Sequence, residues 1–408
     1  MRNVVALVLA GGYTANFGVL TQNRPKAALT FAASYRIVDF ALSNLRNSQI
    51  EQVGIIIQYL PSSLIEHVGV GQPWDLQGYG RLLKIMPPFV GVDNTDWYNG
   101  TADALYQNLN LLDDLSPEHV VVASGEQVYK LDFAEVMASH RDRNADITMV
   151  TKSIPESRCT HRFGYATVGD GGRLTAFVEK PESFPSTEVS TGITVFKASV
   201  LRDLLEENAR GSSHNLAKDI LSKRVGEFKS YVYSSPDYWE YLEDLADYYR
   251  VQFELLECGG QDQIRQWGIL TNMEYRGLGF AAPAHFTSTA SVQSTVAAGN
   301  CRIAGTTDHC ILSPGVVVEK GAVVRNSILL HDCRVEDGAV VENVVADKDV
   351  VFGSGCRVGV DVAEGTPANP HFGNLTLIGK SVQIMEGARV PRGTELAPGR
   401  GPFRPLAN

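Results

Sequence analysis

With 408 residues, the chain is long for a single core and predicts about two domains. Its formal net charge of −10 at pH 7 argues against nucleic acid or an anionic membrane surface as a partner. No run of residues approaches the roughly 20 apolar side chains of a membrane-spanning helix, and the start of the chain lacks the pattern of a signal peptide. We therefore expect a cytoplasmic protein that binds neither nucleic acid nor membrane.

The cysteines show neither a C-x-x-C pair nor the spacing of a zinc site. This pattern predicts free thiols in a reducing compartment rather than disulfides or metal ligands. The six positions are Cys159, Cys258, Cys301, Cys310, Cys333 and Cys356.

Up to about residue 258, nearly continuous apolar segments alternate with helical patterns. Strands are expected at 4–10, 52–58, 119–124, 146–152 and 192–197, and helices at 38–48, 102–114, 132–143, 199–208 and 237–257. This alternation predicts a mostly parallel sheet covered on both faces, in a Rossmann-like α/β domain. Ligands of such domains bind at the carboxyl ends of the strands. The motif LAGG (9–12) spans the carboxyl end of the first predicted strand and is therefore expected at a ligand site.

From about residue 286, short β-branched triplets recur every five to seven residues. Gly315 and Gly321 are six residues apart, as are Val317 and Val323. This hexapeptide rhythm predicts a left-handed parallel β-helix, in which stacked coils supply the core that one short strand cannot. The expected organisation is an α/β domain over 1–258, a connector over 259–285 and a β-helix domain over 286–408.

Further along, three segments are candidates for binding a ligand. Lys26 follows Gly12 by fourteen residues and is a candidate phosphate ligand, although an ordinary solvated lysine explains it as well. In YRIVDFALSN (35–44), Arg36 and Asp39 are candidates to bind a ligand. An Arg–Asp pair that only anchors the start of a helix explains the pattern equally well. In WYNGTADA (97–104), small residues begin a helix whose free N–H groups allow a ligand to approach closely.

Six stretches, taken together and in order, resemble the glucose-1-phosphate adenylyltransferase (ADP-glucose pyrophosphorylase) family. They are LAGG, RPKAAL, YRIVDFALSN, WYNGTADA followed by Gln107 and Asn108, FVEKP (177–181) and STGITVF (190–196). The resemblance extends to the connector and the β-helix. It implies a nucleotidyltransferase of glycogen biosynthesis that converts ATP and glucose 1-phosphate into ADP-glucose and pyrophosphate with Mg²⁺. It also implies a homo- or hetero-tetramer of family members that is regulated by phosphorylated allosteric effectors.

The resemblance further assigns roles to residues of this chain. Lys26 and Glu126 are expected to be catalytic, with Glu126 as a metal ligand, and Arg24 lies in the expected effector region. The residues expected to bind the nucleotide are Leu9, Ala10, Gly11, Gly12, Gln58, Gly100 and Thr101. The residues expected to bind the sugar phosphate are Asp103, Tyr165, Glu179, Lys180, Ser190 and Gly192.

The chain departs from the family pattern in its triphosphate loop. The family reads Gly-Gly-x-Gly-Thr-Arg-Leu where this chain has residues 11–17. Thr14 replaces the inner glycine, which restricts the backbone, and Asn16 replaces the arginine, which removes a fixed cation.

A second departure concerns the metal. The family motif Gly-Asp-His becomes Gly-Glu-Gln at 125–127, and Trp-Arg-Asp-Val-Gly-Thr becomes WEYLED at 239–244, with Tyr241 in place of the aspartate. Glu240, Glu243 and Asp244 are candidates to compensate. The departures predict either an adenylyltransferase with weakened catalysis or a non-catalytic regulatory member of the family that assembles with a catalytic partner.

A third class of function follows from the β-helix alone. Acyltransferases use similar coils, and His309 or His331 is the candidate base. The N-terminal motifs disfavour this alternative.

Overall fold

The computed structural model describes residues 1, 3–89, 97–211, 213–257, 259–274, 280–362, 369, 371–399 and 402–403. Its contacts divide the chain into two compact units. The first contains Met1–Gly12, Ile37–Tyr241 and Gly268–Leu270, and the second contains Tyr13–Arg36, Leu242–Trp267 and Thr271–Asn408. Cys258 and residues 275–279 of the expected connector lie outside the described residues. The linear boundaries at 258 and 285 stay predictions.

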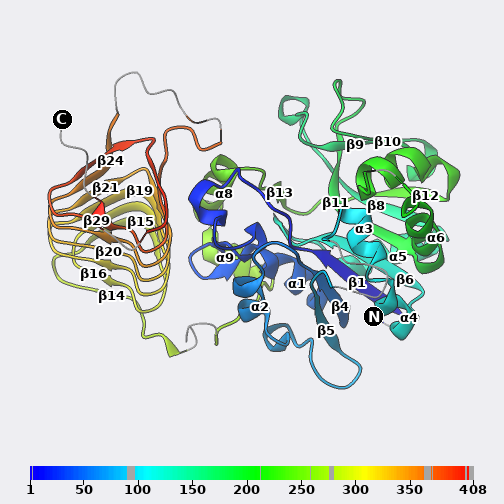
Figure 1. Cartoon of the computed structure of the whole chain (residues 1–408), viewed down its shortest axis with the longest axis horizontal. Helices are drawn as coiled ribbons and strands as arrows, with labels where there is room; N and C mark the ends of the chain where they lie inside the picture. Colours follow the sequence, from blue (N-terminus) through cyan, green and yellow to red (C-terminus); the bar gives the residue numbers. More distant parts are fainter. Residues whose placement is uncertain are drawn as a thin grey trace. The chain divides into compact units, whose positions relative to one another are not determined.

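Within the described residues, the first unit contains a sheet of nine strands, which Figure 1 shows together with its helices. Its main path runs β10-β9-β11-β6-β1-β4-β5, and β8 and β12 extend from β11. The strands are β1 (Val4–Leu9), β4 (Gln52–Ile56), β5 (Leu82–Met86), β6 (His119–Ser124), β8 (Ile147–Ser153), β9 (Gly164–Val168), β10 (Leu174–Glu179), β11 (Glu188–Lys197) and β12 (Ser230–Ser234).

The centre of this sheet is parallel. Strand β1 pairs in parallel with β4 and β6, and β4 pairs in parallel with β5, whereas β11 runs antiparallel to β6. The apolar residues of β1 from Val4 to Val8 are all buried, as expected for a strand covered on both faces. The helices of the unit are α1 (Ile37–Asn47), α2 (Ser62–Val68), α3 (Thr101–Tyr106), α4 (Leu109–Leu115), α5 (Phe133–Asp142), α6 (Ala198–Asn208) and α7 (Ser222–Arg224).

Two predicted helices differ from the structure. The helix expected over 102–114 is divided into α3 and α4 near Asn108, whose side-chain amide donates to the Ala104 carbonyl and the Tyr98 hydroxyl. The start of the helix expected over 237–257 is wrong, because Trp239–Tyr241 form strand β13, which pairs with β7 (Gln127–Tyr129). In that region the helix α8 covers only Leu245–Glu257.

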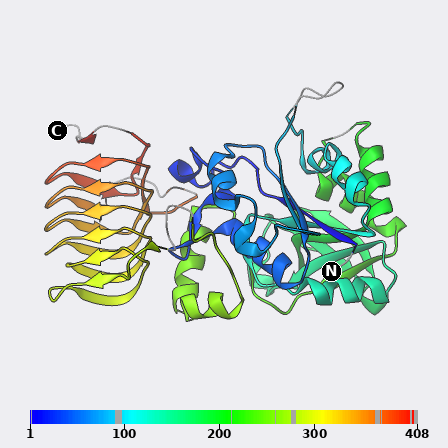
Figure 2. The same cartoon turned by 90° about the horizontal axis from the view of Figure 1, so that it is seen from below.

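In the second unit, short parallel strands stack into the predicted left-handed β-helix, whose successive coils are visible in Figure 2. Apolar residues repeat at the same position of successive coils and fill the interior: Ile303, Val318, Val335, Phe352 and Ile384. The α/β domain followed by a β-helix is therefore confirmed as the fold class. The strands are β14 (His285–Phe286), β15 (Ser291–Ala297), β16 (Arg302–Ile303), β17 (Thr306–Leu312), β18 (Val317–Val318), β19 (Val323–Leu329), β20 (Arg334–Val335), β21 (Val340–Glu342), β22 (Val344–Ala346), β23 (Val351–Phe352), β24 (Arg357–Val362), β25 (Thr376–Ile378), β26 (Gln383–Ile384), β27 (Arg389–Arg392), β28 (Glu395–Leu396) and β29 (Pro402–Phe403).

The second unit also contains residues 13–36 with β2 (Thr30–Phe31) and β3 (Tyr35–Arg36), the helix α8, and the helix α9 (Gly260–Gln266). On α8, Phe253 stacks on the His309 ring with 4.1 Å between ring centroids. His309 Nδ1 lies 3.0 Å from Asn326 Oδ1, and His331 is buried. These surroundings favour packing roles for the two histidines over the acyl-transfer alternative. Among the helices of the described residues, none is long and apolar enough to span a membrane.

Candidate active site

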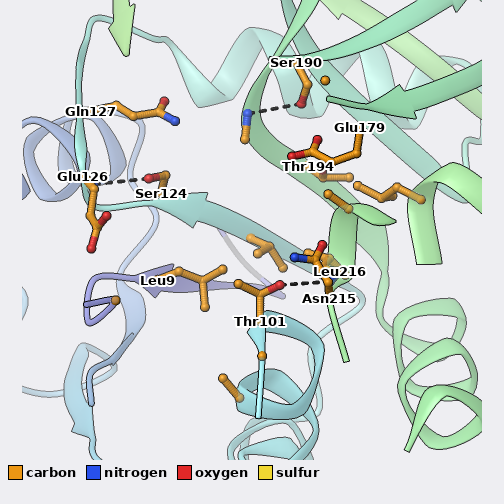
Figure 3. A pocket seen from close by; sticks show the side chains of 18 of the residues that line it. Leu9, Thr101, Ser124, Glu126, Gln127, Glu179, Ser190, Thr194, Asn215 and Leu216 are labelled. Carbon is orange, nitrogen blue, oxygen red and sulfur yellow. Dashed lines mark hydrogen bonds between the residues drawn. The ribbon is translucent and has the colours of Figure 1, made fainter. Parts of the chain in front are cut away.

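A cavity of about 470 Å³ lies in the first unit at the carboxyl ends of the parallel strands. Leu9 ends β1, Gln58 follows β4, and Ser124 ends β6, and all three line the cavity. Figure 3 shows Leu9 and Ser124 at one side and residues of β10 and β11 at another. The position agrees with the rule that ligands of α/β sheets bind at strand carboxyl ends.

The residues expected to bind the nucleotide all line this cavity: Leu9, Ala10, Gly11, Gly12, Gln58, Gly100 and Thr101. Gly11 is required by close packing, since a Cβ atom there would stand 2.3 Å from the Gln58 backbone nitrogen. The Gln58 side chain is held by a residue of the cavity wall, because its Oε1 accepts from the Tyr98 backbone N–H at 2.6 Å.

Four of the residues expected to bind the sugar phosphate line the same cavity: Glu179, Lys180, Ser190 and Gly192. The pairing of β11 with β8 is irregular between Ser190 and Ile193. Such an irregularity re-aims side chains beside a site. Glu179 ends β10, and its burial raises the pKa of its carboxyl, while Lys180 acts in the opposite direction.

Asp103 and Tyr165 are not among the described residues that line the cavity. The Asp103 carboxylate accepts from the Asn99 N–H at 2.7 Å and so serves the start of α3. Tyr165 is fully buried, and its hydroxyl accepts from the Thr160 N–H and donates to the Thr160 carbonyl, each at 2.8 Å. Their assignment to the sugar phosphate stays a prediction.

Lys26 and Arg24 belong to the second unit. Lys26 is buried and its Nζ donates to the Leu242 carbonyl at 2.8 Å. Arg24 is buried in a two-point ion pair with Asp347, with both N–O distances at 2.8 Å. Their catalytic and regulatory roles also stay predictions.

The two replaced residues of the loop have local hydrogen bonds within the second unit. The Thr14 hydroxyl accepts from the Asn16 N–H at 3.3 Å, and the Thr14 carbonyl accepts from the Thr21 hydroxyl at 2.9 Å. The Asn16 amide donates to the Glu243 carbonyl at 3.4 Å. Both side chains therefore serve the fold of this loop.

At the expected metal position, Glu126 lines the cavity and the next residue, Gln127, pairs with Tyr241 across β7 and β13. Tyr241 thus lies in the strand that pairs with β7, and its replacement of a metal-binding aspartate stays a prediction. Its ring packs edge-on against Phe163 with 6.0 Å between centroids. The Gln127 side chain accepts from the Trp239 indole N–H at 2.9 Å, which further fixes β13.

The candidates to compensate for Tyr241, which are Glu240, Glu243 and Asp244, are not among the described residues that line the cavity. Glu240 is buried, and its two carboxylate oxygens accept from Arg158 at 2.8 and 3.0 Å. Glu243 and Asp244 belong to the second unit. Throughout the part of the chain that the structure describes, no three His, Cys, Asp or Glu side chains form a group able to hold a metal. Since Mg²⁺ demands near-octahedral oxygen ligation, the residues present do not fit a metal held by the protein alone.

Sequence reasoning missed one wall of the cavity. Asn215, Leu216 and Ala217 line it, and Figure 3 shows the first two near Thr101. They begin a short π-helix, η6 (Leu216–Leu221), and the Thr101 hydroxyl accepts from the Leu216 N–H at 2.9 Å. π-Helical turns are frequent at functional sites. Asn215 is the sequence signal that could have located this wall, because asparagine favours the position that caps the start of a helix. In the structure its side chain accepts from the Lys218 N–H.

Comparison with known proteins agrees with this architecture. Residues 5–257 match the family model described as Nucleotidyl transferase, and residues 280–369 match that described as GlmU-like, C-terminal hexapeptide. The sheet of the first unit is thus that of a nucleotidyl transferase.

Similarity to individual relatives identifies the family within the nucleotidyl transferases. The chain is 31% identical over 395 residues to the glucose-1-phosphate adenylyltransferase of Desulfitobacterium hafniense (strain DSM 10664 / DCB-2), covering 96% of this chain and 97% of the relative. It is 32% identical over 396 residues to that of Fervidobacterium nodosum, covering 96% and 94%. It is 35% identical over 329 residues to that of Thermosipho africanus, covering 80% and 78%. The chain belongs to the glucose-1-phosphate adenylyltransferase family.

Proposed function

We propose that the chain binds ATP and glucose 1-phosphate in this cavity and joins them into ADP-glucose and pyrophosphate, more slowly than a relative with two metal-binding aspartates. The observation that carries the proposal is the single cavity lined by all the residues expected to bind the nucleotide and by four of those expected to bind the sugar phosphate. Curated relatives that match nearly the whole chain bear the name of this activity.

The chemistry of the lining suits the two substrates. Gly11 and Gly12 let phosphate oxygens approach the backbone closely. Lys180 supplies a positive charge for the sugar phosphate, and the Glu179 carboxyl supplies acceptors for sugar hydroxyl groups. Mg²⁺, which the family implies as cofactor, would meet Glu126 as its one carboxylate ligand from the cavity and depend on substrate phosphates for others.

The lower rate is inferred from three features. Tyr241 stands where a second carboxylate is expected, Thr14 restricts the loop, and Asn16 carries no charge. Charge stabilisation is the main contribution that a protein makes to phosphoryl-type transfer, so the loss of a metal ligand and a cation slows the reaction. We extend the proposal to assembly with family members as a homo- or hetero-tetramer and to regulation by phosphorylated effectors. An effector anion at Arg24 would have to compete with Asp347.

A second candidate function is favoured by the aromatic residue at the metal position. A chain with Tyr241 there could bind sugar phosphate without turning it over and act as a regulatory partner of a catalytic family member. In that case it would alter the kinetics of a catalytic relative when the two are mixed, without producing ADP-glucose itself.

The test is pyrophosphate release by the purified chain with ATP, glucose 1-phosphate and Mg²⁺, beside the Desulfitobacterium hafniense relative. Slow release that requires both substrates supports the proposal. Release as fast as that of the relative would refute the weakened catalysis, and none above background would leave the regulatory candidate.

A further inference from the structure

One wall of the cavity is built from two segments that lie far apart in the sequence. Phe163 comes from the loop before β9, whereas Trp239 and Tyr241 come from β13, and all three line the cavity. The Phe163 ring packs against the rings of Trp239 and Tyr241, with centroids 5.6 and 6.0 Å apart. The shape of this wall therefore depends on how the loop is attached to β13.

Strand β13 is the fixed side of the wall. Its backbone pairs with β7. Before the strand, the Lys152 ammonium donates to the carbonyls of Ser235, Pro236 and Asp237 at 3.3, 2.8 and 2.6 Å. Because Lys152 belongs to β8 of the nine-stranded sheet, β13 is tied to that sheet as well as to β7.

The loop over residues 155–163 is shaped by hydrogen bonds of short range. The Arg158 N–H donates to the Pro155 carbonyl at 2.8 Å, and the Thr160 N–H donates to the Tyr165 hydroxyl at 2.8 Å. These bonds set the conformation of the loop and its connection to β9. They do not reach β13.

An ion pair joins this loop to β13. Arg158 Nη2 donates to both carboxylate oxygens of Glu240, at 2.8 and 3.0 Å. The Glu240 side chain is 8% exposed and that of Arg158 is 50% exposed, so the arginine reaches from the surface to a buried carboxylate. Charge-assisted hydrogen bonds of this kind are stronger than neutral ones. In the ungapped comparison, Glu240 stands where the family motif has an arginine, which could not accept from Arg158.

The loop is also connected to residues expected to bind the sugar phosphate. The Phe163 carbonyl accepts from the Lys180 N–H at 3.1 Å, and Gly164 pairs with Glu179 between β9 and β10. A shift of Phe163 would therefore shift the end of β10. The residues expected to bind the nucleotide come from other segments, and Figure 3 shows Leu9 apart from Glu179.

We propose that Arg158 is a positioning residue for the sugar phosphate, which acts by holding the loop over 155–163 against Glu240 of β13. The inference rests on the proposed function, because it takes glucose 1-phosphate as the ligand beside Glu179 and Lys180. Binding groups need to be held within roughly 0.5 Å of their productive positions. Loss of the ion pair loosens the loop and the end of β10, so it weakens binding of the sugar phosphate and leaves the nucleotide unaffected.

The test is calorimetric titration of the full chain in Mg²⁺, once with glucose 1-phosphate and once with ATP. Arg158→Gln should raise the dissociation constant of glucose 1-phosphate about fivefold or more, and should leave that of ATP within about twofold. Glu240→Gln should act in the same way, and combining the two changes should add less than about twofold, because the side chains act through one contact.

Two further variants complete the design. Arg158→Lys should restore most of the affinity for glucose 1-phosphate, because its ammonium can still pair with the Glu240 carboxylate. Arg202→Gln is the matched control and should change neither dissociation constant. Arg202 forms ion pairs with Asp113 and Glu206, and it is not among the described residues that line the cavity.

The outcomes separate this inference from the proposed function. If the wild-type chain binds both substrates and Arg158→Gln changes neither dissociation constant, or both by the same factor, the inference is refuted and the function stands. A selective loss that Arg158→Lys does not reverse also refutes it, because the charge is then not what matters. If the wild-type chain binds no glucose 1-phosphate, the proposed function fails and the inference with it. A loss confined to glucose 1-phosphate and reversed by lysine supports the inference.

Discussion

Asp347→Asn is expected to destabilise the second unit by about 3 to 5 kcal/mol, because it leaves a buried guanidinium beside a neutral amide. The side chains of Arg24 and Asp347 are 4% and 0% exposed, and they meet through two hydrogen bonds of 2.8 Å. Asp347 Oδ1 also accepts from the Lys348 N–H at 2.8 Å. Because both side chains are buried, the cost of breaking this pair needs no discount for solvent screening, unlike that of an exposed pair.

Thermal unfolding followed by calorimetry measures this effect. For a cooperative unit of about 150–250 residues, a loss of 3 kcal/mol lowers the Tm by roughly 6 to 12 °C. Asp337→Asn is the matched control, since Asp337 is exposed on the same β-helix and its loss should cost less than about 0.5 kcal/mol.

Replacing both partners gives the complementary result. Arg24→Met with Asp347→Leu should recover most of the stability lost in Asp347→Asn, because no charge is left buried. A destabilisation below about 1 kcal/mol in Asp347→Asn, or no recovery in the double variant, would refute the reasoning that the ion pair ties residues 13–36 to the β-helix.

The remaining predictions concern the first unit. Gly11→Ala should lower its free energy of unfolding, measured by urea titration, by about 1 to 3 kcal/mol, because the new Cβ would stand 2.3 Å from the Gln58 backbone nitrogen. Gly12→Ala is the control and should be tolerated, because its Cβ would meet nothing closer than 3.8 Å. Acid should also destabilise this unit. Burial lowers the pKa of His140 from 6.5 to about 4, so the folded state favours the neutral imidazole. The stability that is present above pH 6.5 therefore falls as the pH drops toward 4, by up to about 3 kcal/mol. His140→Gln should flatten this part of the pH profile of unfolding, and an unchanged slope would contradict the assignment.

Much of the fold follows from local sequence pattern. The strands β1, β4, β6, β8 and β11 coincide with apolar runs, and the β-helix follows from its hexapeptide repeat. Local pattern is sufficient there because burial on both faces, or stacking of coils, leaves a strong periodic signal.

The sequence-based predictions are wrong where contacts between residues far apart in the sequence determine the structure. Trp239–Tyr241 form a strand because they pair with Gln127–Tyr129, more than a hundred residues earlier, although the surrounding residues favour a helix. Residues 13–36 join the β-helix unit through contacts such as Arg24 with Asp347, which no local pattern reveals.

The sequence predicts only part of the candidate site, because one wall of the cavity is formed by contacts between residues far apart in the sequence. The rule that ligands bind at strand ends placed Leu9 at the site, and the resemblance to the family assigned Gln58 and Glu179 to it. All three line one cavity. Asn215 carries only the weak signal of a helix cap, and its approach with Leu216 to Thr101 depends on the packing of η6 against α3.

The most direct test of the proposed chemistry is the initial rate of ADP-glucose formation by the wild-type chain and by a variant combining Thr14→Gly, Asn16→Arg, Glu126→Asp and Tyr241→Asp, at saturating ATP, glucose 1-phosphate and Mg²⁺. The variant is predicted to be at least tenfold faster, because it regains a metal carboxylate and a cation for the triphosphate, each worth about 1.4 kcal/mol or more in the transition state. A wild-type rate equal to or above that of the variant would contradict the account.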